Sequence, residues 1–305
     1  MVNILVTGGT GFIGTNLTNE LRLRGHEVWT LDIDHGEDER HFRVDVGSYQ
    51  QLENVFRNYQ FDFVYHLAAE YGRWNGEDHY ENLWQTNVIG AKHLLRLQEK
   101  QGFKMIFFSS AEVYGDYDQL MTEDVMERIP IKQMNDYAIS KWAGELQCLN
   151  HANMFGVEVV RVRPVNCYGP HEYYSPYRGV IPVFVYCCLK NKPFTIYKGH
   201  KRIFDYVDDT VRTVANIVDN FIPGEVYNVG SREDWEVRIE ELAQIIFKET
   251  GADPNLAQVK GEEAFTTRVK VVDFSKSRRD LQHKAEIGLQ EGIRRYVQWM
   301  RKAYS

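Results

Sequence analysis

The stretch VTGGTGFIG, residues 6–14, decides the fold of this chain of 305 residues. It places Gly8, Gly11 and Gly14 three residues apart, after a short apolar run and before a helical pattern. Glycine allows a turn with positive φ, lets a pyrophosphate approach the backbone, and lets the helix lie close to the strand. Because the N-terminus of that helix then faces the phosphates, the stretch predicts a dinucleotide-binding turn.

Acidic residues after the next two predicted strands support this interpretation. Asp32 lies in LDID, residues 31–34, at the end of the second strand, where a carboxylate accepts hydrogen bonds from the adenosine ribose. A carboxylate there repels a 2′-phosphate, so the sequence predicts NAD rather than NADP. Asp45 and Val46 follow the third strand and are expected near the adenine, although Asp45 is also typical of an ordinary turn.

The rest of the first half alternates β-rich runs with helical patterns. Strands are expected within residues 3–8, 26–33, 61–69, 103–110 and 157–164, and helices within 12–25, 50–59, 79–101 and 135–155. Several of the strands are continuously apolar, as in a parallel sheet covered on both faces. The predicted fold class is α/β, with a doubly wound parallel (Rossmann) sheet.

The second half has a looser order. Helices are expected near 180–191, 208–220, 238–250 and 288–302, between short strands and Gly/Pro turns. We therefore predict a dinucleotide-binding domain over residues 1–165. Residues 166–305 are expected mainly to form a smaller substrate-binding lobe, some segments of which could return to the first domain.

Composition and charge narrow the classes of partner. The formal charge is 36 − 43 = −7, so no broad basic surface indicates nucleic acid or anionic lipid. Cys148, Cys167, Cys187 and Cys188 lack the paired spacings of a zinc or redox site, and no metal is predicted. The N-terminus does not look like a signal peptide, and the longest apolar run, 180–189, is short for a membrane helix. A cytoplasmic protein is expected.

A second motif, DYAISKWAGE, places Tyr137 and Lys141 four residues apart on one face of a predicted helix. A phenol is a poor base at neutral pH, but a nearby ammonium and a positive nicotinamide both favour its phenolate. The pair therefore predicts a proton-transfer group, although such a spacing alone also occurs on ordinary helix surfaces.

Taken together, these motifs resemble a known family. The glycine turn, HLAA at 66–69, SSAEVYG at 109–115, Tyr137 with Lys141, RPVNCYGP at 163–170 and RIFDYVDD at 202–209 occur in the order typical of extended short-chain dehydrogenases/reductases. More narrowly, the chain resembles their NAD-dependent nucleotide-sugar epimerase/dehydratase branch. The resemblance implies a nucleotide-diphosphate sugar as substrate and a homodimer. Helices 79–101 and 135–155 are the candidate interface, although both could equally be covered by their own sheet.

The resemblance also implies roles for individual residues. Ser110, Tyr137 and Lys141 would form the catalytic triad, in which Tyr137 takes a proton from a sugar hydroxyl while NAD takes the hydride. The expected cofactor-binding residues are Gly8, Gly11, Phe12, Ile13, Gly14, Asp32, Asp45, Val46, Leu67, Ala68, Ala69, Tyr137 and Lys141. The expected substrate-binding residues are Asn166, Arg178, Val180, Arg202 and Arg268. Arg178 and Val180 belong to residues 171–184, which are predicted to form a lid over the nucleotide or, alternatively, an aromatic surface loop packed on the sheet.

Glu112 and Ala111 leave the reaction open. Dehydratases of the family carry a glutamate at the position of Glu112, which removes the C5 proton. Those acting on thymidine sugars usually add an aspartate where this chain has Ala111. Related decarboxylases keep the glutamate without that aspartate, and their β-keto acid needs less acid catalysis. Alternatively, Glu112 binds a hydroxyl or acts as a structural carboxylate at the strand end.

From these residues we predict an NAD-dependent nucleotide-sugar epimerase that oxidises C4 transiently. The alternatives are a 4,6-dehydratase or a UDP-glucuronate-type decarboxylase that uses Glu112. Two further classes are a net NADPH-dependent reductase, which Asp32 disfavours, and a non-catalytic NAD sensor, which the intact triad disfavours.

Overall fold

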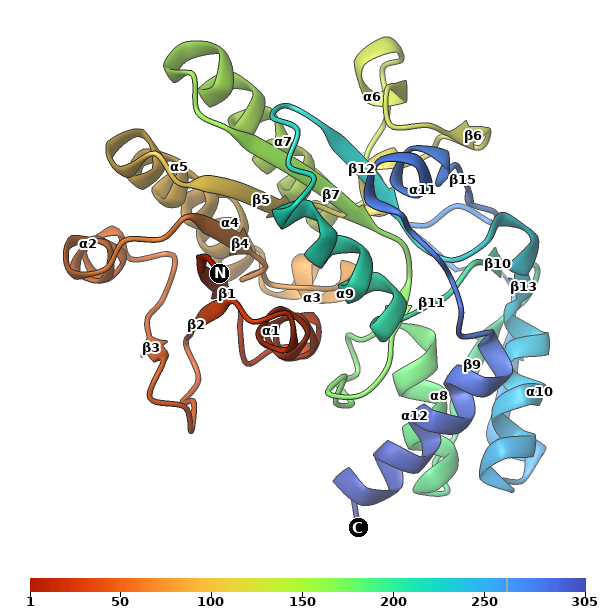
Figure 1. Ribbon diagram of the computed structural model, residues 1–305. Helices are drawn as coiled ribbons and strands as arrows, with labels where there is room; N and C mark the ends of the chain where they lie inside the picture. The colour runs from red at the N-terminus through yellow and green to blue at the C-terminus, as the bar shows by residue number, and fades with distance from the viewer. Residues whose placement is uncertain (262) are drawn as a thin grey trace.

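The fold is centred on one parallel sheet, in a computed structural model that describes residues 1–261 and 263–305 (Figure 1). The seven strands are β1 (Asn3–Thr7), β2 (Glu27–Asp32), β3 (His41–Arg43), β4 (Phe63–His66), β5 (Lys104–Phe108), β7 (Val159–Pro164) and β12 (Val226–Val229). Their order is β12-β7-β5-β4-β1-β2-β3, which reverses direction at β1. This order confirms the predicted doubly wound sheet.

Alternate side chains of each strand supply two apolar layers. Ile4 and Val6 of β1 pack on one face and Leu5 on the other, and all three are fully buried. The helices around the sheet are α1 (Phe12–Leu23), α2 (Tyr49–Asn58), α5 (Gly90–Gln101), α7 (Asp136–Phe155), α9 (Val207–Ala215) and α11 (Ser275–Leu281). Apolar side chains of α1 and α9 cover the first face, and those of α2, α5 and α7 cover the second. Burial on both faces explains why the strands are continuously apolar in sequence.

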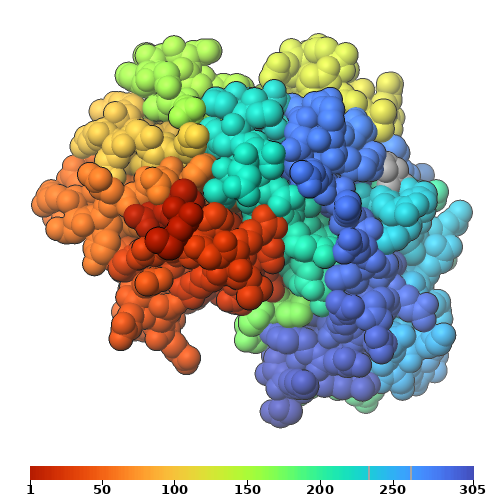
Figure 2. All heavy atoms as spheres, viewed as in Figure 1, coloured from red at the N-terminus to blue at the C-terminus, as the bar shows by residue number. Residues whose placement is uncertain are grey.

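Segments beyond residue 165 complete the sheet as well as forming the lobe. Strand β12 pairs in parallel with β7, and α9 packs on α1, so both extend the dinucleotide-binding half. Space filling shows residues near 205–230 between the first and the last parts of the chain on one face (Figure 2). The two regions therefore interleave along the sequence.

The lobe has its own apolar core, beside the carboxyl ends of the central strands. It contains α8 (Val180–Leu189), α10 (Ile239–Thr250), α12 (Leu289–Ala303) and the parallel pair β9 (Phe194–Tyr197) and β14 (Ala257–Lys260). Three two-stranded pairs join it to the sheet region: β8 (Cys167–Tyr168) with β11 (Asp205–Tyr206), β10 (Lys201–Arg202) with β13 (Val237–Arg238), and β15 (Val271–Val272) with β6 (Leu120–Met121). The predicted helix 208–220 is α9 followed by the 3-10 turn η3 (Asn216–Val218).

The helix expected over residues 79–101 contains a π turn. Its parts are α4 (Tyr80–Trp84), the π segment η1 (Gln85–Ile89) and α5. The side chain of Asn87 in η1 accepts from the amide of Glu70 at 2.8 Å and donates to the hydroxyl of Ser140 on α7 at 3.0 Å. The π turn thus joins the loop after β4 to the helix that carries Tyr137, a use of π turns that is common near functional sites.

Two shorter helices complete the fold. They are α3 (Arg73–Asp78) and α6 (Val125–Arg128), and the 3-10 turns η2 (Ala111–Tyr114) and η5 (Pro254–Leu256) connect other elements. No helix in the described part of the chain is both long enough and apolar enough to cross a bilayer.

Candidate active site

The glycine turn is packed so closely that side chains at two of its positions would clash. Gly8 has a φ of +69°, and a Cβ there would lie 2.7 Å from the amide nitrogen of Ala68. A Cβ at Gly14 would overlap the carbonyl oxygen of Gly8. The start of α1 therefore lies against the turn, and its backbone N–H groups face an open cavity at the edge of the sheet.

The predicted cofactor residues line this one cavity. They are Gly8, Gly11, Phe12, Ile13, Gly14, Asp32, Asp45, Val46, Leu67, Ala68, Ala69, Tyr137 and Lys141. The Asp32 carboxylate accepts from the amide of Thr10 at 3.1 Å, which holds it beside the glycine turn. The Asp45 carboxylate accepts from the amide of Gly47 at 2.8 Å, so it forms an ordinary turn and also faces the cavity. A continuous cavity from the glycine turn to Tyr137 fits an extended dinucleotide.

The predicted triad lies at the far end of the same cavity. Ser110 ends the β5 segment, and its hydroxyl accepts from the amide of Glu112 at 3.1 Å and is hydrogen-bonded to Tyr137. The Lys141 ammonium donates to the carbonyl of Phe108 at 2.9 Å and lies 6.0 Å from the centre of the Tyr137 ring. One strand end and one helix face therefore bring the three residues together.

Without a bound cofactor, Tyr137 and Lys141 differ electrostatically from the sequence-based expectation that the ammonium helps to favour the phenolate. Burial raises the pKa of Tyr137, and the neighbouring Tyr71 raises it further, while the hydrogen bond with Ser110 lowers it. Burial also lowers the pKa of Lys141 to about 8. The low polarity of the site outweighs the ammonium as an influence on the phenol, so a further positive charge is needed to favour the phenolate.

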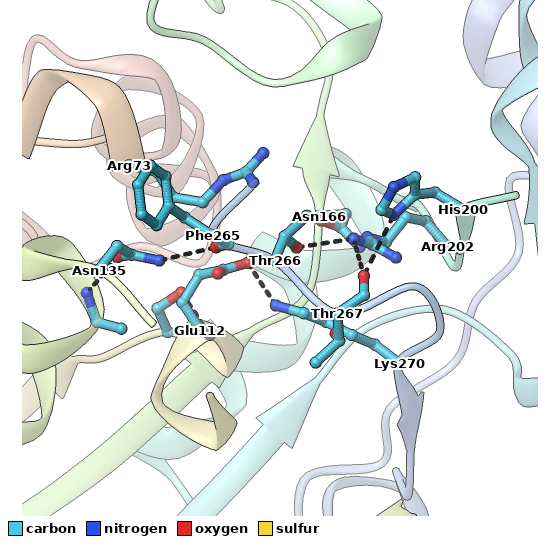
Figure 3. A network of polar contacts seen from close by, with 12 residues as sticks. Arg73, Glu112, Asn135, Asn166, His200, Arg202, Phe265, Thr266, Thr267 and Lys270 are labelled. Atoms are coloured by element: carbon cyan, nitrogen blue, oxygen red, sulfur yellow. Dashed lines mark hydrogen bonds and ion pairs between the residues drawn. The ribbon is translucent and has the colours of Figure 1, made fainter. Parts of the chain in front are cut away.

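Glu112 has a partner that sequence reasoning missed. The Lys270 ammonium donates to the Glu112 carboxylate at 2.5 Å, and Lys270 is 4% exposed (Figure 3). Burial raises the pKa of Glu112, but Lys270, Arg73 and Arg202 outweigh it and bring that pKa to about 2. Burial lowers the pKa of Lys270, and Glu112 opposes that shift. Glu112 is therefore a carboxylate at neutral pH and a weak base.

A second cavity adjoins the first on the side of the lobe. Asn166, Val180 and Arg202, which were predicted to bind substrate, line it, whereas Arg178 lines the dinucleotide cavity, with its guanidinium 5.2 Å from the centre of the Tyr71 ring. The Asn166 amide group donates to the carbonyl of Ile203 at 2.9 Å. Arg268 is exposed and is not among the described residues that line either cavity, so its predicted role has no support in this geometry.

Arg202 organises the wall of the second cavity. Its guanidinium donates to the carbonyls of Lys201, Thr267 and Arg268 and to the hydroxyl of Thr266, at 2.7 to 2.9 Å (Figure 3). The same wall is tied to the sheet domain by an ion pair of 2.9 Å between Arg73 and Glu263. Arg202 thus places segment 263–268 against the cavity that it also lines.

Residues of the site that sequence reasoning missed include Lys270, Asn87, Glu172, Arg73 and Tyr71. The sequence contained a signal only for Glu172, which belongs to the stretch proposed as a lid. Within the described residues, no group of three or more His, Cys, Asp or Glu side chains could hold a metal ion.

Comparison with known proteins agrees with the geometry. The model of the "NAD dependent epimerase/dehydratase family" matches residues 4–230. A UDP-N-acetyl-alpha-D-glucosaminuronate decarboxylase of Bacillus cytotoxicus is 32% identical, over 98% of this chain and 97% of that protein. A probable dTDP-glucose 4,6-dehydratase of Sinorhizobium fredii is 30% identical, over 98% and 92%. The UDP-glucose 4-epimerase of Thermus thermophilus, solved with NAD, superposes with a TM-score of 0.88 and 28% identity over 99% of each chain.

Proposed function

The chain belongs to the NAD dependent epimerase/dehydratase family, and on that premise we propose that it decarboxylates the uronate of a nucleotide-linked sugar after oxidation at C4. The family and the relatives make it an NAD-dependent enzyme of nucleotide-sugar modification. NAD, when bound, supplies the acceptor for the C4 hydride and later returns it. The remaining chemistry belongs to side chains of this chain.

The triad serves the oxidation at C4. Tyr137 takes the proton of the C4 hydroxyl, and Ser110, to which it is hydrogen-bonded, positions the same oxygen. Lys141 is held by the carbonyl of Phe108, with its charge on the Tyr137 side of the cavity. Because burial raises the pKa of Tyr137, this step depends on every cation within reach of the phenol.

The carrying observation is the ion pair between the half-buried Glu112 and the buried Lys270. A carboxylate with a pKa of about 2 is a weak base, so removal of the C5 proton, on which 4,6-dehydration and C5 inversion depend, is disfavoured. Ala111, which is 4% exposed, offers no acid for a departing hydroxyl. Decarboxylation needs neither group, because a ketone at C4 is β to the C6 carboxylate and accepts the electrons of the breaking bond.

Cations in the site suit an anionic sugar. Lys270, Arg73 and Arg202 act together on Glu112. Arg178 lines the dinucleotide cavity together with Glu112. Arg73 and Arg202 line the adjoining cavity, and Lys270 adjoins the site through its contact with Glu112. A C6 carboxylate can exchange with Glu112 as the partner of Lys270, and the ammonium can then protonate C5 after carbon dioxide has left. The similarity to a glucosaminuronate decarboxylase supports this assignment.

A second candidate is the epimerase predicted from the sequence. The triad and NAD suffice for inversion at C4, and Ala111 adds no group that another reaction would require. In that case Glu112 and Lys270 bind the substituent at C5 and transfer no proton in the reaction.

One experiment separates the candidates. The protein is incubated with NAD in heavy water and with UDP-glucuronate, UDP-N-acetylglucosaminuronate, UDP-glucose or dTDP-glucose, and the product mass is followed. Decarboxylation predicts loss of carbon dioxide and one deuterium at C5. Unchanged mass with an inverted C4 would establish the epimerase, and loss of water would refute both proposals.

A further inference from the structure

Glu172 lies where the two cavities meet. It follows β8 in the loop that leads to α8, and it is 3% exposed. Both cavities are lined by Glu172 together with Tyr71, Asn166 and Cys167. The dinucleotide cavity ends at Tyr137 and the other extends into the lobe, so this carboxyl group lies between two expected ligands.

The backbone around Glu172 is held from two sides. Its amide donates to the carbonyl of Gly169 at 3.1 Å, and its carbonyl accepts from the hydroxyl of Tyr296 on α12 at 2.5 Å. His171 has a φ of +70°, which completes the tight turn. The backbone from which this side chain extends is therefore held in place by the fold.

One oxygen of this buried carboxyl group lacks a partner. No described residue forms a hydrogen bond with Oε2 of Glu172. Burial raises the pKa of Glu172 to about 8, and the positive charge of Arg178 opposes the shift. Buried polar atoms in folded proteins nearly always have partners, so an unpartnered oxygen on a residue that lines two cavities indicates a missing donor.

We propose that Glu172 is a ligand-binding residue that accepts a hydrogen bond from an O–H or N–H group of NAD or of the nucleotide sugar. The inference rests on the proposed function only for the second ligand. It assigns to the predicted lid a specific contact at the junction. Removal of the carboxyl group should weaken the binding of the ligand that supplies the donor by roughly tenfold, which corresponds to the loss of one such hydrogen bond.

Asp205 provides a matched control. It is 1% exposed, its Oδ1 has no partner among the described residues, and burial raises its pKa to about 8. Unlike Glu172, it is absent from the described residues that line the two cavities. A general effect of buried acids would appear in both residues, whereas ligand binding would appear only in Glu172.

The test is calorimetric titration of wild type, Glu172→Met, Glu172→Gln and Asp205→Asn. NAD is titrated into protein freed of dinucleotide, and UDP-glucuronate into NAD-saturated protein. We expect Glu172→Met to weaken one ligand about tenfold, which identifies the source of the donor, and Glu172→Gln, which keeps an acceptor oxygen, to stay within about threefold.

Two results would overturn the inference: unchanged affinities for both ligands in folded Glu172→Met, or an equal loss in Asp205→Asn. If wild type binds NAD but not UDP-glucuronate, UDP-glucuronate is excluded as the substrate, and the NAD titration alone decides the role of Glu172.

Discussion

At the scale of single residues, Lys270 determines the chemistry available to Glu112. Lys270→Met would leave the Glu112 carboxylate without its ion-pair partner and raise its pKa, while the C6 carboxylate of the proposed uronate substrate would lose its partner. We expect kcat for uronate decarboxylation to fall about 100-fold, as is typical when a positioned proton donor is removed. Lys270→Arg should retain more activity.

The control for Lys270 is Lys276→Met, which removes a lysine paired with Glu225 outside the cavities. Its kcat should equal that of wild type. A Lys270→Met protein that is folded and as active as wild type would contradict the role of the pair in turnover.

Asp205 makes stability depend on pH in a defined direction. Its pKa rises from 3.8 to about 8 on folding, so the folded state binds the proton more tightly than the unfolded state. This contribution to stability is complete below about pH 4 and is lost as the pH rises to 8, at up to about 1.4 kcal/mol per pH unit. Asp205→Asn, which cannot ionise, should therefore match wild type near pH 4 and be more stable at pH 9.

Urea unfolding at several pH values measures this difference. Parallel stability curves for the two proteins between pH 4 and 9 would contradict the raised pKa of Asp205. Glu172→Gln should also make the free energy of unfolding less dependent on pH between 4 and 9, because the pKa of Glu172 is also raised to about 8.

What the sequence could predict at this scale depends on the distance between partners along the chain. Ser110 and the pair Tyr137 and Lys141 each lie in one short motif, and a parallel sheet brings strand ends to one edge. Lys270 meets Glu112 across 158 residues, through the pairing of two-residue strands β15 and β6. No periodicity marks such short strands. The sequence therefore did not predict Lys270, and Arg268 was predicted as the substrate-binding residue of this segment.

At the scale of elements, a buried ionic network joins helix α7, which carries Tyr137 and Lys141, to the loop after β5, which carries Ser110 and Glu112. Glu145, one turn after Lys141 on α7, accepts from Ser109 beside Ser110 at 2.5 Å and from Arg163 of β7 at 2.8 Å. Arg163 also donates to the hydroxyl of Tyr114 at the end of η2. The network therefore fixes helix α7 relative to the loop that carries Ser110 and Glu112.

Glu145→Gln should destabilise the protein strongly. It would leave the guanidinium groups of Arg161 and Arg163, which are 3% and 1% exposed, without their counter-charge. Breaking a buried pair in this way typically costs about 3 to 5 kcal/mol. Urea unfolding tests this, with Glu291→Gln as the exposed control, expected to cost less than about 1 kcal/mol. Equal losses in the two variants would contradict a structural role for the network.

At the scale of the whole molecule, the sequence predicted the sheet better than the division of the chain. Strands β1, β2, β4, β5 and β7 lie within β-rich runs that are mostly apolar, so their pattern alone identified them, whereas β3, with the sequence HFR, has no apolar pattern and its range was not predicted. The four residues of β12 are no more apolar than other short runs of the second half, and only their pairing with β7 shows where they belong. The proposed boundary at 165 therefore marks where the order of elements along the sequence changes, while β12 and α9, which follow it, pack in the sheet region.

An exposed apolar surface on helices α5 and α7 is the expected site of assembly. Helices α5 and α7 pack together, and their outer surface exposes Ile89 of η1 and Ile139 and Leu146 of α7, at 40%, 39% and 48%. Positions 139 and 146 are seven apart and share a helix face, and an apolar face of this kind is typical of an interface. We propose that two copies pair through it in an isologous dimer. Sedimentation should show a dimer for wild type and for Ile222→Glu, which alters a residue 45% exposed elsewhere, but a monomer for Leu146→Glu. A monomeric wild type, or a Leu146→Glu dimer of unchanged affinity, would place any interface on another face.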